Sequence, residues 1–367
     1  MPLKTEILVA MSGGVDSAVS ALIAKEACGA AAIGATMKLF DEELLGRPIT
    51  STCCSIDDVD DAKEVCHKIG ISHYTLNCKR AFTKHVVDPF VAAYMAGVTP
   101  NPCIACNKHL KFDELIRKAK TLGANVVATG HYARIESIHG SHVLMRGRDP
   151  KKDQSYVLHT LTKEQLEHVI FPIGKLAKTE VRQIASAYDL VVAEKKESQD
   201  ICFVEDGSVD KFIAHYLNNK NYKPQAKKGT FVTRTGEKVG EFDMHTNFTI
   251  GQRKGLNLAL GHPVYVTEID KQNNIVTIGE KDDLIKTWVN AVDFNWISTT
   301  PKVRDKIACT AKIRYNMKDV PAIAHFNAEG TCSVNFPEGV SAPAKGQSIV
   351  LYDGDVVLGG GYIKDAK

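Results

Sequence analysis

Residues 6–28, EILVAMSGGVDSAVSALIAKEAC, decide the fold of the first half of this chain. Residues 6–11 form a short apolar run typical of a buried strand, and residues 15–28 carry apolar side chains at helical spacing. A glycine-containing turn joins the two. A strand that runs through such a turn directly into a helix is typical of a parallel sheet, which binds its ligands at the carboxyl ends of its strands.

The rest of the first half continues the alternation of strands and helices. The pattern predicts strands over residues 30–37, 73–76 and 125–129, and helices over residues 57–69, 80–96 and 107–122. Strands that alternate with helices of this length favour an α/β fold with a doubly wound parallel sheet.

The pattern of apolar residues changes after about residue 206. Residues 227–241 and 264–280 alternate in strand fashion, and from residue 288 onward short strands are separated by turn clusters, with a hairpin signal at residues 353–355. We therefore predict three domains: a nucleotide-binding domain at 1–206, a small mostly-β domain at 207–284 and a C-terminal β-barrel at 285–367.

Composition narrows the class of protein. The chain has 367 residues, 44% of them hydrophobic, a formal net charge of +3 and ten cysteines. No apolar run reaches the length of a membrane span, and no export signal is recognisable at the N-terminus. We therefore expect a cytoplasmic protein without membrane association, whose cysteines are thiols available for chemistry. A charge of +3 is too small to identify a nucleic-acid partner by itself.

Residues 12–17, SGGVDS, lie between the first strand and the first helix, where backbone N–H groups and the positive end of the helix converge. Two adjacent glycines let a phosphate approach the backbone, Ser12 and Ser17 offer hydroxyl donors, and Asp16 is suited to a magnesium ion. The lysine of a Walker loop and the G-x-G-x-x-G fingerprint are both missing. The alternative is a plain glycine turn.

The loop resembles that of the N-type ATP pyrophosphatases, whose S-G-G-x-D-S sequence grips the pyrophosphate of ATP while AMP is transferred. The resemblance implies ATP with Mg²⁺ as the nucleotide and adenylation as the reaction, but it leaves the acceptor open. The nucleotide contacts it implies are Ala10, Met11, Ser12, Gly13, Gly14, Val15, Asp16, Ser17, Met37 and Gly130.

Two cysteine segments bear on the acceptor. Residues 99–108, TPNPCIACNK, lead into a helix that we expect to be capped near Asn107, which would place Cys106 at a helix N-terminus beside two lysines and favour its thiolate. A C-x-x-C pair is also typical of half a zinc site or of a redox pair. Cys202 lies in residues 197–203, ESQDICF, where a lone cysteine is commonly part of the core.

Together these segments are similar to the tRNA-specific 2-thiouridylases, and the resemblance covers nearly the whole chain. It includes the segments CCS at 53–55, GHYAR at 130–134, KDQSY at 152–156, TIGQRKG at 249–255 and KIRY at 312–315. The resemblance implies 2-thiolation of the wobble uridine of tRNAs for Lys, Glu and Gln. Cys202 would carry a persulfide from a sulfur donor, a cysteine desulfurase or a sulfur-relay protein, and Cys106 would complete the transfer.

One position departs from some relatives. Where they have an aspartate suited to proton transfer, this chain has Cys103, so no aspartate base is assigned. Cys103, Cys106 and Cys202 would also suit an iron–sulfur cluster with one iron free to hold sulfide. The persulfide route is favoured and the cluster route stays open.

The tRNA contacts are expected from resemblance and from local chemistry. Residues 146–154 form a basic run, and Arg314 with Tyr315 pairs a phosphate-binding cation with a stacking face. The tRNA contacts implied are His131, Lys152, Asp153, Gln154, Arg314, Tyr315 and Gln347, and the pocket for the target base is formed by Asn101, Pro102 and Cys103. A solvated loop and a packed tyrosine are the structural alternatives.

Two other functions remain possible from the residues. Another adenylating ligase with the same loop would need no paired thiols, and a nonenzymatic RNA-binding protein would need no intact loop. The acceptor that gains sulfur or AMP distinguishes these functions.

Overall fold

The computed structural model describes residues 7–28, 31–40, 44, 56–196, 201–204, 208–222, 228–243, 248–298, 301–302, 304–328 and 330–367. The CCS segment at 53–55 and residues 197–200 lie outside this part. The chain forms two compact units: residues 1–87, 102–207 and 355–357 make up the first, and residues 88–101, 208–354 and 358–367 the second. The three-domain division with boundaries near 206 and 284 stays a prediction.

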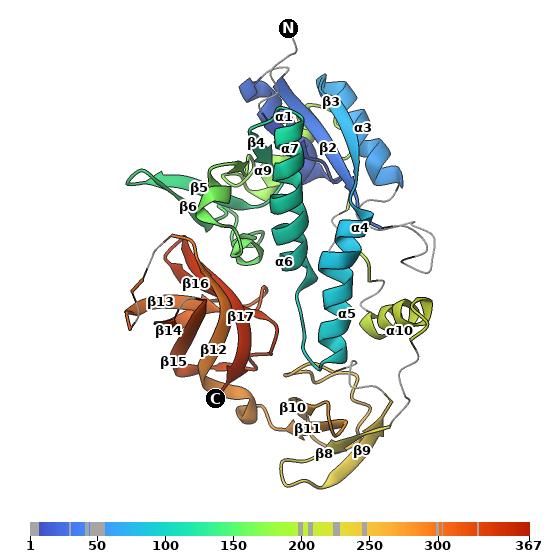
Figure 1. Cartoon of the computed structure of the whole chain (residues 1–367), viewed down its shortest axis with the longest axis vertical. Coiled ribbons are helices and arrows are strands. Elements are labelled where there is room, and N and C mark those ends of the chain that lie inside the picture. Colours follow the sequence, from blue (N-terminus) through green and yellow to red (C-terminus); the bar gives the residue numbers. More distant parts are fainter. Residues whose placement is uncertain are drawn as a thin grey trace. The chain divides into compact units, whose positions relative to one another are not determined.

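A five-stranded parallel sheet organises the first unit (Figure 1). Its strands are β1 (Ile7–Ala10), β2 (Ala32–Lys38), β3 (Ser72–Asn77), β4 (Val126–Ala128) and β7 (Val169–Ile170), in the order β3-β2-β1-β4-β7. Every pairing in this sheet is parallel. The chain moves from β1 towards β2 on one side, whereas β4 lies on the other, so the sheet has a switch point between β1 and β4. The predicted doubly wound fold is confirmed.

Helices cover this sheet because their apolar sides need burial. Helix α1 (Val15–Cys28) packs against β1, β2 and β4, and α3 (Ile56–Ile69) packs against β2 and β3. Helix α9 (Lys178–Ala187) packs against α1. The shared core contains Val9, Val19, Leu22, Val65, Ala128 and Val181, each at most 1% exposed except Leu22 at 4%. This core fixes the turn between β1 and α1.

Two long helical segments contain π-helical turns. The first consists of α4 (Lys79–Phe82), η2 (Thr83–Val87) and α5 (Asp88–Met95), and the second of α6 (Pro102–Cys106), η3 (Asn107–Glu114) and α7 (Leu115–Thr121). The expectation that the second helix starts near Asn107 was wrong, because it already starts at Pro102. Proline is favoured at the first helical position, where its fixed φ fits and its missing N–H is not needed.

The segment between β4 and α9 was not resolved into elements from the sequence. It contains a hairpin of β5 (Ala133–Ile138) and β6 (Ser141–Arg146), followed by η4 (Ser155–Leu158) and α8 (Lys163–Leu166). Met145 of β6 pairs with Val356, which belongs to the same unit. Thr162 and Gln165 form a capping box that starts α8.

The second unit contains the helix α10 (Val209–Asn219). The sequence did not predict this helix, because the alternating pattern after residue 206 indicated strands. Its buried residues recur at helical spacing, Phe212, Ile213, Tyr216 and Leu217, and Phe212 packs against Phe90 of α5. A four-stranded sheet follows in the order β10-β11-β8-β9. Its strands are β8 (Gly229–Val232), β9 (Lys238–Phe242), β10 (Tyr265–Asp270) and β11 (Ile275–Gly279).

The C-terminal strands of the second unit close into a barrel. They follow the order β12-β15-β14-β13-β16-β17, and pairing between β12 and β17 completes the circle. The strands are β12 (Ile285–Trp296), β13 (Lys306–Lys312), β14 (Val320–Ala328), β15 (Thr331–Ser341), β16 (Ser348–Asp353) and β17 (Val356–Ala366). The turn between β16 and β17 contains Gly354 at φ +54°, as the hairpin signal at 353–355 predicted. The predicted barrel is confirmed.

Candidate active site

The SGGVDS turn occupies the carboxyl end of β1, next to the switch point of the sheet. The backbone N–H of Ser12 donates to Ser17 Oγ at 3.1 Å, and the Ser17 hydroxyl donates to the carbonyl of Gly14 at 2.9 Å. The two hydroxyl oxygens of Ser12 and Ser17 are 3.2 Å apart. These bonds close the turn on itself at the start of α1, and the N–H groups of a helix N-terminus commonly bind anions.

Two glycines are required by the packing around this turn. Gly13 adopts φ +70°, and a Cβ added to it would lie 2.3 Å from the carbonyl oxygen of Asp58. A Cβ on Gly130, which follows β4, would lie 2.9 Å from backbone atoms of Asp16 and Ser17. The structure therefore brings Gly130 and the turn at 12–17 together, and their nucleotide contacts stay predictions.

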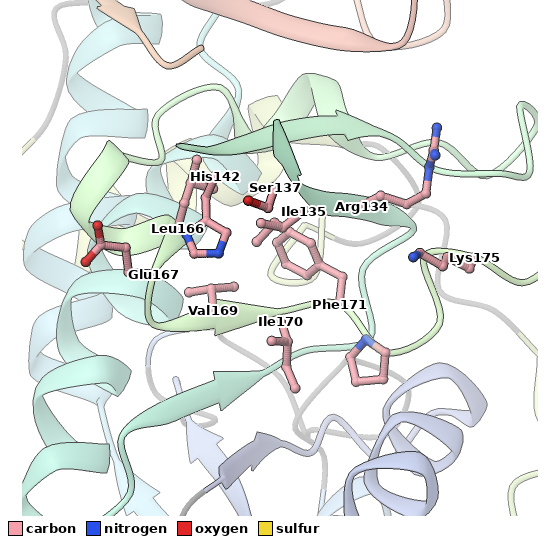
Figure 2. Close-up of a pocket in the computed structure, with 11 residues that line it drawn as sticks. Arg134, Ile135, Ser137, His142, Leu166, Glu167, Val169, Ile170, Phe171 and Lys175 are labelled. Carbon is pink, nitrogen blue, oxygen red and sulfur yellow. The ribbon is translucent and has the colours of Figure 1, made fainter. Parts of the chain in front are cut away.

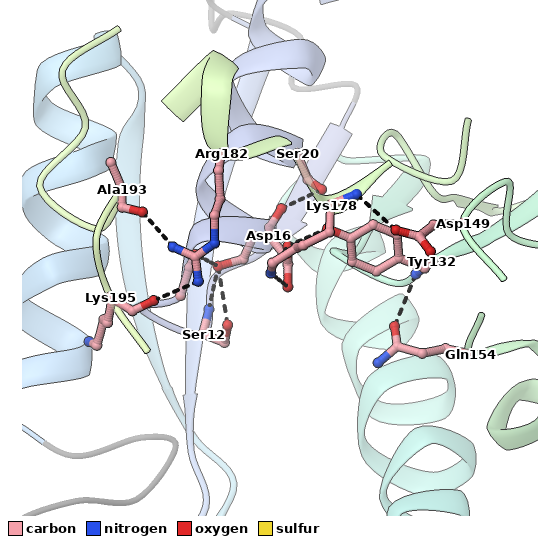
Figure 3. A network of polar contacts seen from close by, with 12 residues as sticks. Ser12, Asp16, Ser20, Tyr132, Asp149, Gln154, Lys178, Arg182, Ala193 and Lys195 are labelled. Atoms are coloured by element: carbon pink, nitrogen blue, oxygen red, sulfur yellow. Dashed lines mark hydrogen bonds and ion pairs between the residues drawn. The ribbon is translucent and has the colours of Figure 1, made fainter. Parts of the chain in front are cut away.

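Asp16 is held by two side chains that the sequence did not identify (Figure 3). The Tyr132 hydroxyl donates to Asp16 Oδ1 at 2.7 Å, and Lys178 Nζ lies 2.7 and 2.8 Å from the two carboxylate oxygens. Lys178 is only 8% exposed. Tyr132 had a signal, since it lies in the GHYAR segment beside Gly130. Lys178 is 162 residues from Asp16, and no signal in the sequence pointed to this contact.

A second ion pair supports the turn from the side of α3. Lys195 Nζ contacts Asp58 Oδ1 at 2.7 Å and also pairs with Asp61. Arg182 of α9 donates to the backbone carbonyls of Ala193 and Lys195, and so fixes this segment. Because Asp58 is the residue against which Gly13 packs, these contacts hold the turn in shape.

Met37, expected to contact the nucleotide, lies near the end of β2 and is 8% exposed. Its neighbour Thr36 bonds to Nε2 of His73 at 2.8 Å. Burial and the nearby Lys63 lower the pKa of His73, so the ring is neutral at pH 7. The nucleotide contact of Met37 stays a prediction.

The helix that starts at Pro102 places the C-x-x-C pair differently from the expectation. Cys103 is exposed in the first turn, and Cys106 is half-buried one turn later. The helix N-terminus therefore lies nearer to Cys103 than to Cys106. Next to Cys106, the amide of Asn107 donates to the carbonyl of Val157 at 3.0 Å, and its buried Oδ1 has no hydrogen-bond partner.

Cys202 is half-buried beside Phe203, whose ring packs edge-on against Phe82. None of the eight cysteines in the described part of the chain is in a disulfide. In the same part, no three His, Cys, Asp or Glu side chains are grouped so as to hold a metal.

The basic run at 146–154 is a loop built around a buried carboxylate. Asp153 accepts bonds from the backbone of Gly147 and Ser155 and from the Ser155 hydroxyl. Gln154 accepts from the backbone of Tyr132 at 2.9 Å. Asp153 and Gln154 therefore shape the loop, and Lys152 is half-buried on it. Their tRNA contacts stay predictions.

His131 is buried and only 7% exposed. Its Nδ1 lies 2.7 Å from the Thr129 hydroxyl, and its ring packs between Phe112 and Phe171. Burial, with a smaller effect of the nearby Lys111, lowers the pKa of His131 well below its usual value, so the ring is neutral at pH 7. A tRNA contact of His131 stays a prediction.

In the second unit, two of the residues expected to face tRNA make backbone contacts. Arg314 donates to the carbonyl of Ala342 at 2.6 Å, and Gln347 Nε2 donates to the carbonyl of Thr99 at 2.8 Å. Thr99 precedes Asn101, so Gln347 holds the segment that leads to the expected base pocket. Arg314 and Tyr315 are both half-buried.

The first unit also contains a cavity of about 350 Å³ between the β5–β6 hairpin and β7 (Figure 2). Ile135, Leu166, Val169 and Phe171 line its interior, and Arg134 and Lys175 lie at one end. Arg134 is paired with Asp355 at 2.7 Å, and Lys175 with Glu136 at 3.0 Å. No residue of the predicted site lines this cavity.

Three family models and several relatives of known family match this chain. The model of the tRNA methyl transferase HUP domain matches residues 5–206, that of the tRNA methyl transferase PRC-barrel domain residues 210–280, and that of the aminomethyltransferase beta-barrel domain residues 286–363. The tRNA-specific 2-thiouridylase MnmA of Clostridium botulinum is 44% identical over 98% of both chains. Those of Clostridium beijerinckii and Clostridioides difficile are 45% and 43% identical over 99% of both chains.

A solved structure is more distant. The U34-tRNA thiolase NcsA from Methanococcus maripaludis, described with its [4Fe-4S] cluster, is 16% identical over 61% of this chain and 75% of its own, with a TM-score of 0.34. A likeness of this size carries no argument about the site.

Proposed function

This chain belongs to the tRNA-specific 2-thiouridylase family, and on that premise we propose that it replaces the C2 oxygen of the wobble uridine with sulfur in tRNAs for Lys, Glu and Gln. It would thus be a tRNA-uridine 2-sulfurtransferase that consumes ATP. The observation that carries the proposal is the closed SGGVDS turn at the switch point of the sheet, with Asp16 at its centre.

The first step we propose is adenylation of the base. The uridine O2 attacks the α-phosphorus of ATP, pyrophosphate leaves, and N3 of the base loses its proton. The N–H groups at the start of α1 and the hydroxyls of Ser12 and Ser17 support this step, because donors of this kind at a helix N-terminus commonly bind phosphate. Gly130 lets the chain after β4 lie close to this turn.

Magnesium usually binds through one or two carboxylates and the phosphates of its nucleotide. Asp16 is one such carboxylate, with a side chain that is 31% exposed, and would be the ligand from this chain. A bound Mg²⁺ would neutralise phosphate charge. The rest of the donor set would come from ATP and water.

The second step we propose is sulfur transfer from a persulfide on Cys202. Its terminal sulfur attacks C2 of the adenylated uridine and AMP leaves; Cys106 then attacks the Cys202 sulfur, which breaks the S–S bond and frees 2-thiouridine. Alternatively, Cys106 attacks the Cys202 sulfur first and releases hydrosulfide, which attacks C2 and expels AMP. Cys106 and Cys202 end as a disulfide, which an external thiol reduces. The donor of the terminal sulfur is a cysteine desulfurase or a sulfur-relay protein.

Burial argues against three of the other thiols. It raises the pKa of Cys66 and Cys332 to about 12 and that of the half-buried Cys309 to about 11. Such thiols are protonated at neutral pH and do not act as nucleophiles. Cys103, Cys106 and Cys202 are at least partly exposed. The iron–sulfur route on these three remains the alternative mechanism.

The tRNA would be held by Lys152, Arg314 and the other expected contacts, and Asn101, Pro102 and Cys103 would line the pocket of the extruded base. Because the substrate is tRNA, we propose the cytoplasm as the site of action. Separately, no helix in the described part of the chain is long and apolar enough to span a membrane.

The proposal is tested by supplying labelled ATP, sulfide or a persulfide donor, and either tRNA or small amine acceptors. We expect AMP release that depends on tRNA, together with 2-thiouridine in the digested tRNA. AMP release with an amine acceptor and without thionucleoside would instead identify another adenylating ligase. tRNA binding without AMP release would identify a nonenzymatic RNA-binding protein.

A further inference from the structure

The turn at 12–17 lacks the lysine with which Walker loops neutralise phosphate, yet a lysine reaches it from elsewhere in the chain. Lys178 is the first residue of α9 and is 8% exposed. Its Nζ contacts both carboxylate oxygens of Asp16 and lies 5.7 Å from the centroid of the Tyr132 ring (Figure 3). The ammonium is therefore located beside the phosphate-binding turn.

The charge of the turn explains why an ammonium is needed there. Asp16 lies in the first turn of α1, so its negative charge faces the region where the pyrophosphate of ATP would bind. The carboxylate of Asp16 and the pyrophosphate are both negatively charged, so they repel each other strongly where water is partly excluded. Lys178 neutralises Asp16, and an ammonium has three donors, so contact with Asp16 is compatible with contact with a phosphate oxygen.

The surroundings of Lys178 fix it in this place. Its backbone N–H donates to Asp149 Oδ2 at 3.1 Å, and the same first turn of α9 contains Glu180, which accepts from the backbone of Ala177. Tyr132, which donates to the same carboxylate, lies beneath the ammonium. The bond from its backbone N–H to Asp149 and the ion pair of its ammonium with Asp16 thus anchor Lys178 at both ends.

We propose, on the basis of the proposed function, that Lys178 is a phosphate-binding residue that contacts the pyrophosphate portion of ATP. It supplies from α9 the cation that a Walker loop takes from its own sequence. The competing explanation is structural: Lys178 would only balance the charge of Asp16 and have no contact with nucleotide.

A double-mutant cycle separates these explanations, with inorganic pyrophosphate as the probe and EDTA to remove metal. The variants are Lys178→Met, Asp16→Asn and the two combined, measured by calorimetric titration. Phosphate binding by Lys178 predicts about tenfold weaker binding in Lys178→Met. It also predicts that Asp16→Asn binds pyrophosphate more tightly than the wild type, because the ammonium of Lys178 then has no competing carboxylate. The double variant, which lacks this ammonium, should not bind more tightly than the wild type.

Lys175→Met is the matched control. It removes a lysine three residues earlier, whose side chain is 69% exposed and paired with Glu136. Pyrophosphate binding should be unchanged in this variant. An equal effect of both lysine substitutions would reduce the role of Lys178 to general charge and overturn the inference.

Equal affinity of Asp16→Asn and the double variant for pyrophosphate would also overturn it, because Lys178 would then matter only through Asp16. This comparison holds even if Lys178→Met alone fails to fold, since the double variant leaves no unpaired charge; thermal unfolding checks that it is folded. Failure of the wild type to bind ATP or pyrophosphate at all would refute the proposed function as well.

Discussion

Gly13 packs directly against the backbone of Asp58, so closely that a Cβ on Gly13 would lie 2.3 Å from the Asp58 carbonyl oxygen. Gly14, its neighbour, differs, because a Cβ there would meet the Ser12 hydroxyl oxygen at an ordinary 3.5 Å. Gly13 also has φ +70°, whereas Gly14 has no such restriction. The two glycines of the turn thus serve different purposes.

Substitution of these glycines should separate folding from binding. Gly13→Ala should lower the midpoint of thermal unfolding by several degrees, since it introduces both a clash and an unfavourable φ. Gly14→Ala should keep the midpoint near wild type and weaken ATP binding, because the added methyl blocks the approach of phosphate. Calorimetry and nucleotide titration check both. Equal unfolding midpoints in the two variants would contradict this division.

Loss of the turn's polar groups should stop adenylation without loss of tRNA binding. Asp16→Ala or Ser17→Ala should abolish AMP formation, because the turn serves phosphate, whereas tRNA affinity should stay near wild type. AMP is measured by chromatography and tRNA affinity by filter binding. Normal thiolation by either variant would show that the turn is not the ATP site.

The basic residues should show their role in the salt dependence of tRNA binding. Lys152→Ala and Arg314→Ala should each weaken binding and reduce the slope of log K against log salt by roughly one, because each removes one phosphate-neutralising charge. ATP affinity should hardly change. If both variants keep the wild-type slope, Lys152 is a loop residue and Arg314 serves only its bond to Ala342.

Alkylation should distinguish the accessible thiols from the buried ones. With iodoacetamide at pH 8, Cys103 should react first because it is exposed. Cys66 and Cys332 should stay unmodified, because their pKa values of about 12 lie above this pH and keep them protonated; their reactivity would rise only as the pH approaches those values. Peptide mapping by mass spectrometry measures the order. Modification of Cys66 as fast as Cys103 would contradict the burial of Cys66.

The parallel sheet and the barrel were predictable because their signals are local. The helix over 15–28 follows from apolar spacing within the helix and from the glycine turn before it, and it was predicted to the residue. The hairpin between β16 and β17 follows from three adjacent residues. Periodicity and turn chemistry determine such elements without any distant contact.

Other features depend on distant contacts or on competing local signals. Lys178 acts on a residue 162 positions away, so no window of sequence contains the pair. The start of the cysteine helix was misplaced because Asn107 is a common cap, whereas Pro102 satisfies the first position of a helix equally well. Helix α10 was missed among strand-like neighbours although its apolar residues have helical spacing.

In the proposed mechanism, Cys106 and Cys202 transfer persulfide sulfur to an adenylated uridine without an iron–sulfur cluster. The most direct test is anaerobic thiolation by protein stripped of iron with a chelator that is then removed, and by iron-reconstituted protein, each given ATP, Mg²⁺, tRNA and a persulfide donor, with Cys103→Ala in parallel. Thionucleoside is counted by mass spectrometry. We predict full activity of the iron-stripped protein, substantial activity of Cys103→Ala, and none of Cys106→Ala or Cys202→Ala. Activity that appears only after iron reconstitution, and is lost in all three cysteine variants, would contradict the persulfide route.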